Sequence, residues 1–207
     1  MDNAHKVLDF WFGARPLTSK RMDERMRFWF GGRATRDLGA LRDEEITGRF
    51  KPMVQRARKG KLDAWAHSPR RRLALILLLD QFPRNIYRGT AKAFSCDARA
   101  EALALEGVQI GADATLDAVE RMFFYMPLQH SEQLAVQEES VTAFRRLTAE
   151  APAQLQRQFK IALGYAELHR DIVKRYGRFP HRNVALGRSS TPEEMSYMRN
   201  SAERFGQ

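Results

Sequence analysis

Residues 73–89 of the chain read LALILLLDQFPRNIYRG, and this stretch decides the fold. Every residue from 73 to 79 is apolar, so a helix formed here has no polar face and must lie inside the core. The preceding Ser68-Pro69 supplies an N-cap and a first-turn proline, and Phe82-Pro83 is expected to stop the helix. The stretch therefore predicts the central helix of a helical core.

Asp80 follows the apolar run directly. Burial and the negative end of the helix dipole both disfavour a carboxylate at this position, so Asp80 needs a cationic partner. Arg84, one helical turn further on, is the nearest candidate. Two interpretations stay open: a structural ion pair, or a group that binds a ligand or transfers protons.

Outside this stretch, apolar residues recur at a spacing of three to four, and no useful length alternates with the period of two typical of strands. The pattern predicts an all-α fold, a single domain over residues 1–207. About nine helices are expected, and they begin near Asn3, Met22, Asp37, Ser68, Asp97, Thr115, Ser131, Pro152 and Thr191. Pro52 is expected to kink or break the third of them.

The expected ends of the first two helices include Pro16 and Gly32, and Phe205 is expected on the inner face of the last helix. Short connections make consecutive helices antiparallel neighbours. Helical hairpins stacked in order form either a compact bundle or a short α-superhelix with a concave groove.

The composition is that of a globular protein: 207 residues, 43% of them hydrophobic, which is enough for an ordinary core without disulfides or metals. The single cysteine, Cys96, can form no internal disulfide and offers no Cys-based zinc site. The longest apolar run, residues 73–79, is far shorter than the roughly 20 residues of a membrane span. We therefore expect a cytoplasmic protein without a membrane partner.

The net charge of +10 is unevenly distributed along the chain. Residues 1–100 carry 22 Lys+Arg and 11 Asp+Glu, hence +11, whereas residues 101–207 carry 13 and 14, hence −1. Such a basic half suggests nucleic-acid binding. However, the basic stretches 51–61 and 70–72 are mixed with core residues, which favours a solvated helical face.

A short motif occurs twice: Phe82-Pro83-Arg84-Asn85 and Phe179-Pro180-His181-Arg182-Asn183. We expect each copy to be a helix exit that leaves Arg and Asn on an ordered turn, where a guanidinium and an amide can bind a carboxylate or phosphate. The two turns would converge if both exits lie on one side of the molecule. The alternative is that these side chains only satisfy carbonyls at the helix ends.

Histidines supply the other candidate groups. His130-Ser131-Glu132 is expected at a helix N-terminus, where His130 and Glu132 could bind an anion or position a base. In the alternative, Ser131 is only an N-cap and Glu132 a first-turn acid. His169 lies on an apolar helix face, which favours a hydrogen-bonded core histidine.

Metal and cofactor sites are not indicated by the sequence. His130, Glu132, His169 and His181 could form a metal centre, but no two histidines have the i, i+4 spacing of a zinc-binding helix. The Walker phosphate loop, the dinucleotide fingerprint and the Gly-x-Ser-x-Gly elbow are also absent from the sequence. We expect no metal and no cofactor.

Four stretches resemble, in order and spacing, the bacterial family known as domain of unknown function 924. They are VLDFWFG at 7–13, LALILLLDQFPRNIYRG at 73–89, MPLQHSE at 126–132 and GRFPHRNVALGRSST at 177–191. The resemblance covers nearly the whole chain. It implies a tetratricopeptide-like α-superhelix, but no established activity, substrate or catalytic residue.

The sequence therefore supports a leading hypothesis and two alternatives. In the leading one, the chain is a binding module that holds an anionic group, either a peptide carboxylate or a small phosphorylated or carboxylated metabolite. The predicted ligand-binding residues are Asp80, Arg84, Asn85, His130, Glu132, His169, His181, Arg182 and Asn183. The second hypothesis is a small-molecule enzyme with Asp80 or Glu132 and His130 or His181 as acid and base. The third is nucleic-acid binding through the basic N-terminal half.

Overall fold

A computed structural model describes residues 3–13, 19–31 and 36–200. Within these ranges the chain is helical and contains no strand, so the all-α prediction is confirmed. The α-helices are α1 Asn3–Phe12, α2 Ser19–Phe30, α3 Arg36–Arg58, α4 Pro69–Leu79, α5 Gln81–Ile86, α6 Asp97–Gln109, α7 Ala118–Gln129, α8 Leu134–Glu150, α9 Gln156–Tyr176 and α10 Pro192–Asn200. The expected positions Pro16, Gly32 and Phe205 lie outside the described residues.

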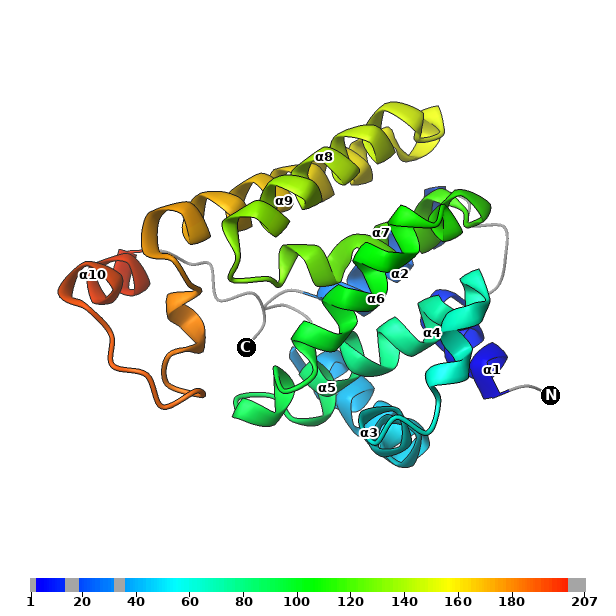
Figure 1. The fold of residues 1–207 in the computed structure, drawn as a ribbon, viewed down its shortest axis with the longest axis horizontal. Helices are drawn as coiled ribbons and strands as arrows, with labels where there is room; N and C mark the ends of the chain where they lie inside the picture. Colours follow the sequence, from blue (N-terminus) through cyan, green and yellow to red (C-terminus); the bar gives the residue numbers. More distant parts are fainter. Residues whose placement is uncertain (1–2, 14–18, 32–35, 201–207) are drawn as a thin grey trace.

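Helix α4 lies in the centre of the main core, as its sequence predicts. Every side chain from Leu73 to Leu79 is buried, and α4 packs against α1, α3, α6 and α7. Helices α8 and α9 form a long antiparallel pair beside α7, and α10 lies at one end of the molecule (Figure 1). A second, small apolar cluster under α10 contains Ile172, Val173 and Phe179. The tetratricopeptide-like superhelix stays a prediction.

The prolines end fewer helices than expected. Helix α4 stops at Leu79, and Pro83 is the third residue of the short helix α5, where its missing N–H costs nothing. The prediction that Arg84 and Asn85 lie on a turn is therefore wrong, because both lie within α5. Helix α3 runs through Pro52 without dividing in two, and α7 continues past Pro127 to Gln129.

Helix starts were predicted with mixed success. Thr191 forms the expected capping box with Glu194. Helix α7 begins later than the predicted Thr115, because Asp117 accepts hydrogen bonds from the first-turn amides. The predicted N-cap Ser131 is wrong, since α8 begins only at Leu134. Pro152 likewise precedes a 3-10 helix over Ala153–Leu155, after which α9 begins.

The backbone of α6 lies close to Arg72 of α4 and Phe124 of α7 at Gly107. A Cβ atom there would lie 2.9 Å from the Arg72 Cδ atom and would collide with the Phe124 ring. Arg72 cannot move away easily, because its buried guanidinium donates to the carbonyl oxygens of Ala66 and Leu103. The packing of α6 on α4 and α7 therefore requires a residue without a side chain at this position.

We predict that Gly107→Ala lowers the free energy of unfolding by about 1–3 kcal/mol, the usual cost of overpacking a core. Gly164→Ala in α9 is the matched control, because a Cβ atom at Gly164 meets nothing within 4 Å. It should stabilise the protein by roughly 0.5–1 kcal/mol through helix propensity. Urea denaturation measures both values, and equal effects of the two substitutions would contradict the packing described here.

Candidate functional site

The candidate site is centred on Asp80, which is the single residue between α4 and α5. Its side chain is 0% exposed. One carboxylate oxygen lies 2.6 Å from Nδ1 of His130 and 3.3 Å from Nη1 of Arg84. The other accepts a hydrogen bond of 2.7 Å from the Gln81 amide. Burial opposes ionisation, but the charge of Arg84 and the contact with His130 hold the pKa of Asp80 far below its usual range. The predicted pairing of Asp80 with Arg84 is confirmed.

Both terminal nitrogens of Arg84 are bonded within this network. Its guanidinium forms a two-pronged ion pair with Asp97, with both N–O distances at 2.8 Å, and also donates to the Asp80 carbonyl oxygen at 3.0 Å. Burial disfavours the charge, but the two carboxylates raise the pKa of Arg84 above its ordinary value. Arg84 therefore stabilises buried carboxylates and has little capacity left for a ligand.

Arg182 reaches the same network from the other end of the chain. It lies in the 3-10 helix Pro180–Arg182, and its Nη1 lies 3.3 Å from the Asp97 carboxylate. The guanidinium carbon lies 4.4 Å from the centre of the Phe179 ring and 4.9 Å from that of Phe94. The two arginines of the repeated motif thus converge on Asp97. Arg84 lies within α5, whereas Arg182 lies on a single 3-10 turn after the end of α9, as the sequence predicts.

The Arg182 side chain is only 6% exposed, yet it is incompletely bonded. Its Nε is buried and has no hydrogen-bond partner among the residues that the structure describes. Burial and the neighbouring Arg84 lower the pKa of Arg182 to about 10, so the group remains charged near neutral pH. A charged, buried donor without an acceptor is the least satisfied group of the cluster.

His130 follows α7 as its C-cap, so the prediction that it lies at a helix N-terminus is wrong. Burial and the charge of Arg84 lower the pKa of His130, although Asp80 opposes this change. The imidazole is therefore neutral near pH 7. Because the ionised Asp80 can only accept, Nδ1 carries the proton and Nε2 keeps its lone pair. The side chain is 15% exposed.

His169 and His181 complete an aromatic wall around Phe179. The His169 ring centre lies 6.3 Å from that of His130 and 5.4 Å from that of Phe179, and His181 lies 5.5 Å from Phe179. Nδ1 of His169 donates to the Tyr165 carbonyl oxygen at 2.7 Å, as expected of a core histidine. Burial and nearby positive groups lower the pKa of both histidines to about 3. Both rings are therefore neutral near pH 7.

Glu132, predicted as a ligand-binding residue, is used within the fold. It accepts a hydrogen bond of 2.8 Å from the Phe179 amide, and both its oxygens bind the guanidinium of Arg188, at 2.6 and 2.9 Å. Glu132 precedes α8, so the alternative interpretation of this residue as a first-turn acid is wrong. Its role here is to fix the segment that carries Phe179 and Arg182 against the α7–α8 turn.

The two asparagines of the repeated motif are also directed away from the cluster. Asn183 donates to Ser190 and Glu194 and accepts from Arg188. Asn85 donates to a backbone carbonyl oxygen one turn earlier in α5. Among the nine predicted residues, the structure brings together Asp80, Arg84, His130, His169, His181 and Arg182.

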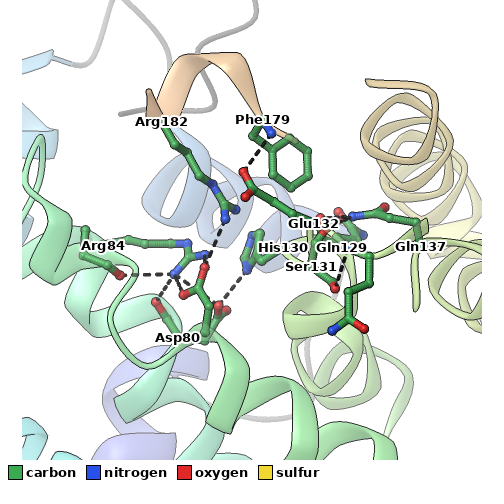
Figure 2. Close-up of polar contacts among 12 residues, drawn as sticks. Asp80, Arg84, Gln129, His130, Ser131, Glu132, Gln137, Phe179 and Arg182 are labelled. Carbon is green, nitrogen blue, oxygen red and sulfur yellow. Dashed lines mark hydrogen bonds and ion pairs between the residues drawn. The ribbon is translucent and has the colours of Figure 1, made fainter. Parts of the chain in front are cut away.

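Several residues of the cluster were not predicted. Asp97 bridges the two arginines, but in the sequence it reads as a helix start. Gln137 holds the turn around His130, because its amide donates to the carbonyl oxygens of Gln129, at 2.7 Å, and Ser131, at 2.6 Å. Figure 2 shows Arg84, Arg182 and His130 pointing toward the region of Asp80, with Gln137 to the right, beside Gln129 and Ser131.

The formal charges of the cluster cancel. Arg84 and Arg182 oppose Asp80 and Asp97, and the three histidines are neutral.

Within the described ranges, no three His, Cys, Asp or Glu side chains are grouped so as to hold a metal ion. None of the helices described is long and apolar enough to cross a membrane.

These features belong to a helical protein with a buried polar cluster, and the comparisons identify its family. The profile described as "Bacterial protein of unknown function (DUF924)" matches residues 7–202, so the chain belongs to this family. A solved structure of a protein of unknown function from Agrobacterium tumefaciens is similar, with 36% sequence identity and a TM-score of 0.77. The similarity covers 96% of this chain and 97% of that chain. No curated protein matches.

The neutral histidines predict how stability depends on pH. His169 and His181 have a pKa of about 3 in the folded chain, below the ordinary value of 6.5. At a pH between these two values, the unfolded chain therefore binds more protons than the folded chain. Stability must therefore fall as the pH falls below 6.5. Each histidine should remove about 2 kcal/mol between pH 8 and pH 5. The carboxyl groups of Asp80 and Glu132 also have lowered pKa values, but these change the stability mainly at a pH below this range.

Urea denaturation at pH 8 and pH 5 tests this prediction. The loss of stability between the two pH values should be about 2 kcal/mol smaller for His181→Gln than for the unsubstituted chain. His67→Gln, which changes an exposed imidazole, is the matched control. The interpretation fails if His181→Gln and the unsubstituted chain lose equal stability.

Proposed function

We propose that this protein is a binding module for a small anion, a carboxylate or phosphate group, held by Arg182. The observation that carries the proposal is the unused edge of this guanidinium. Nη1 is bonded to Asp97, but Nε is buried and has no hydrogen-bond partner in the described part of the chain. Leaving a buried donor unbonded costs about 1–3 kcal/mol, which an incoming oxygen acceptor would recover.

The shape of the unused edge favours an anion with two oxygens. Nε and Nη2 point the same way from one side of the planar guanidinium, so they can donate in parallel to a carboxylate or phosphate. Phe94 and Phe179 lie beside the guanidinium and fix its plane, which reduces the entropy lost on binding. Arg84 is the less suitable anchor because Asp80 and Asp97 already use it.

The burial of Arg182 indicates a small ligand. With 6% of the side chain exposed, only a compact group can reach the unused edge. The duplex phosphates that a nucleic-acid-binding protein contacts need arginines on the surface instead. The site therefore supports the leading hypothesis of anion binding, with one arginine as the anchor instead of two Arg-Asn pairs.

Thermal unfolding in the presence of acetate or inorganic phosphate tests the proposal. At about ten times Kd, the bound anion should raise Tm by roughly 3–6 °C. Arg182→Lys keeps the charge but loses the planar edge, so it should bind about 10–100 times more weakly.

Arg145→Gln is the control, because it removes a charge from an exposed arginine, and it should behave as the unsubstituted chain. If neither anion raises Tm in a saturable way, or if Arg182→Lys binds as tightly as the unsubstituted chain, the proposal is wrong.

A further inference from the structure

We infer that His130 is a general base that acts on the anion held by Arg182, with Asp80 as its positioning residue. The inference rests on the proposed function and adds a proton-transfer activity to it. The substrate class is a small carboxylate or phosphate compound that carries an ionisable O–H or C–H group near its anionic end.

The contact between Asp80 and His130 has the geometry that a general base requires. Asp80 lies 2.6 Å from Nδ1 and is ionised, so the imidazole proton is on Nδ1. Nε2 then has its lone pair available, and it makes no hydrogen bond with any residue that the structure describes. A carboxylate on the far nitrogen orients the ring and stabilises the imidazolium that forms when Nε2 accepts a proton.

Two chains of contacts join His130 and Arg182. The polar chain runs from His130 through Asp80, Arg84 and Asp97 to Arg182. The aromatic chain runs from His130 through His169 and Phe179 to Arg182. Figure 2 shows the His130 ring and the Arg182 guanidinium on the same side of the α7–α8 turn. An anion on the unused edge of Arg182 therefore binds in the neighbourhood of His130.

The proton balance needs no further reactant. Nε2 accepts the proton of the substrate O–H or C–H group, and the bonding electron pair stays on the substrate atom. The imidazolium gains one positive charge beside Asp80, and the substrate gains one negative charge near Arg182. Asp80 stays ionised throughout, because Arg84 and the contact with His130 hold its pKa far below the usual range.

The base is also held rigidly. Gln137 donates from α8 to the carbonyl oxygens on both sides of His130, those of Gln129 and Ser131. The Gln81 amide holds the second oxygen of Asp80. A ring fixed from two directions keeps its lone pair aimed at one point, which is the condition for efficient proton transfer.

Labelling of the full-length protein with diethyl pyrocarbonate tests the inference, with each histidine followed by mass spectrometry. The reagent acylates an imidazole nitrogen that has a free lone pair. His130 should react as fast as the exposed His5 and His67, despite being mostly buried. Saturating phosphate or acetate, whichever raises Tm, should slow His130 about tenfold or more and leave His67 unchanged.

Asp80→Asn should slow the labelling of His130 by about tenfold, while His67→Gln should not. If Asp80→Asn does not fold, labelling of the unsubstituted chain with and without the anion still decides the matter. An unreactive His130 in a protein that binds the anion would overturn the inference alone. A reactive His130 in a protein that binds neither anion would overturn the proposed function. The inference that His130 acts on the bound anion would then fail as well.

Discussion

The rest of the structure depends on the burial of one carboxylate, that of Asp80. A charge removed from water must be paired, and the chain pairs this one with Arg84, His130 and Gln81. These partners come from α5 and from the end of α7, so the requirement joins elements that are distant in sequence. Losing Arg84 would leave the buried charge of Asp80 uncompensated, which typically costs about 3–5 kcal/mol.

The same requirement produces the candidate site. Once Asp80 is ionised, it sets the proton of His130 on Nδ1 and leaves Nε2 as an acceptor. Arg84 needs a second carboxylate, Asp97, and Asp97 in turn attracts Arg182. Asp97 is already bonded to Arg84, and the Nε of Arg182 is left without an acceptor in the described residues. The network that stabilises the fold therefore leaves two groups without partners in the described residues. They are the acceptor Nε2 of His130 and the donor Nε of the Arg182 guanidinium.

Local patterns in the sequence predicted local structure well. The apolar run at 73–79 predicted the buried helix α4, the capping box at Thr191 predicted the start of α10, and the i, i+4 spacing predicted the Asp80–Arg84 pair. Contacts between distant segments were not predictable, because tertiary packing decides which acceptor a side chain reaches. The sequence therefore indicated only a helix start at Asp97. It also indicated a ligand-binding group at Asn183, whose side chain is hydrogen-bonded to Glu194 and Arg188.

The protonation state of His130 shows whether Asp80 holds this ring as a base. Long-range nitrogen-proton NMR correlations on uniformly ¹⁵N-labelled protein at pH 7 distinguish the two neutral tautomers from the imidazolium. We expect a neutral ring at pH 7, with the proton on Nδ1 and an unprotonated Nε2. A proton on Nε2, or a ring that is charged at pH 7, would show that Asp80 does not hold His130 as a base.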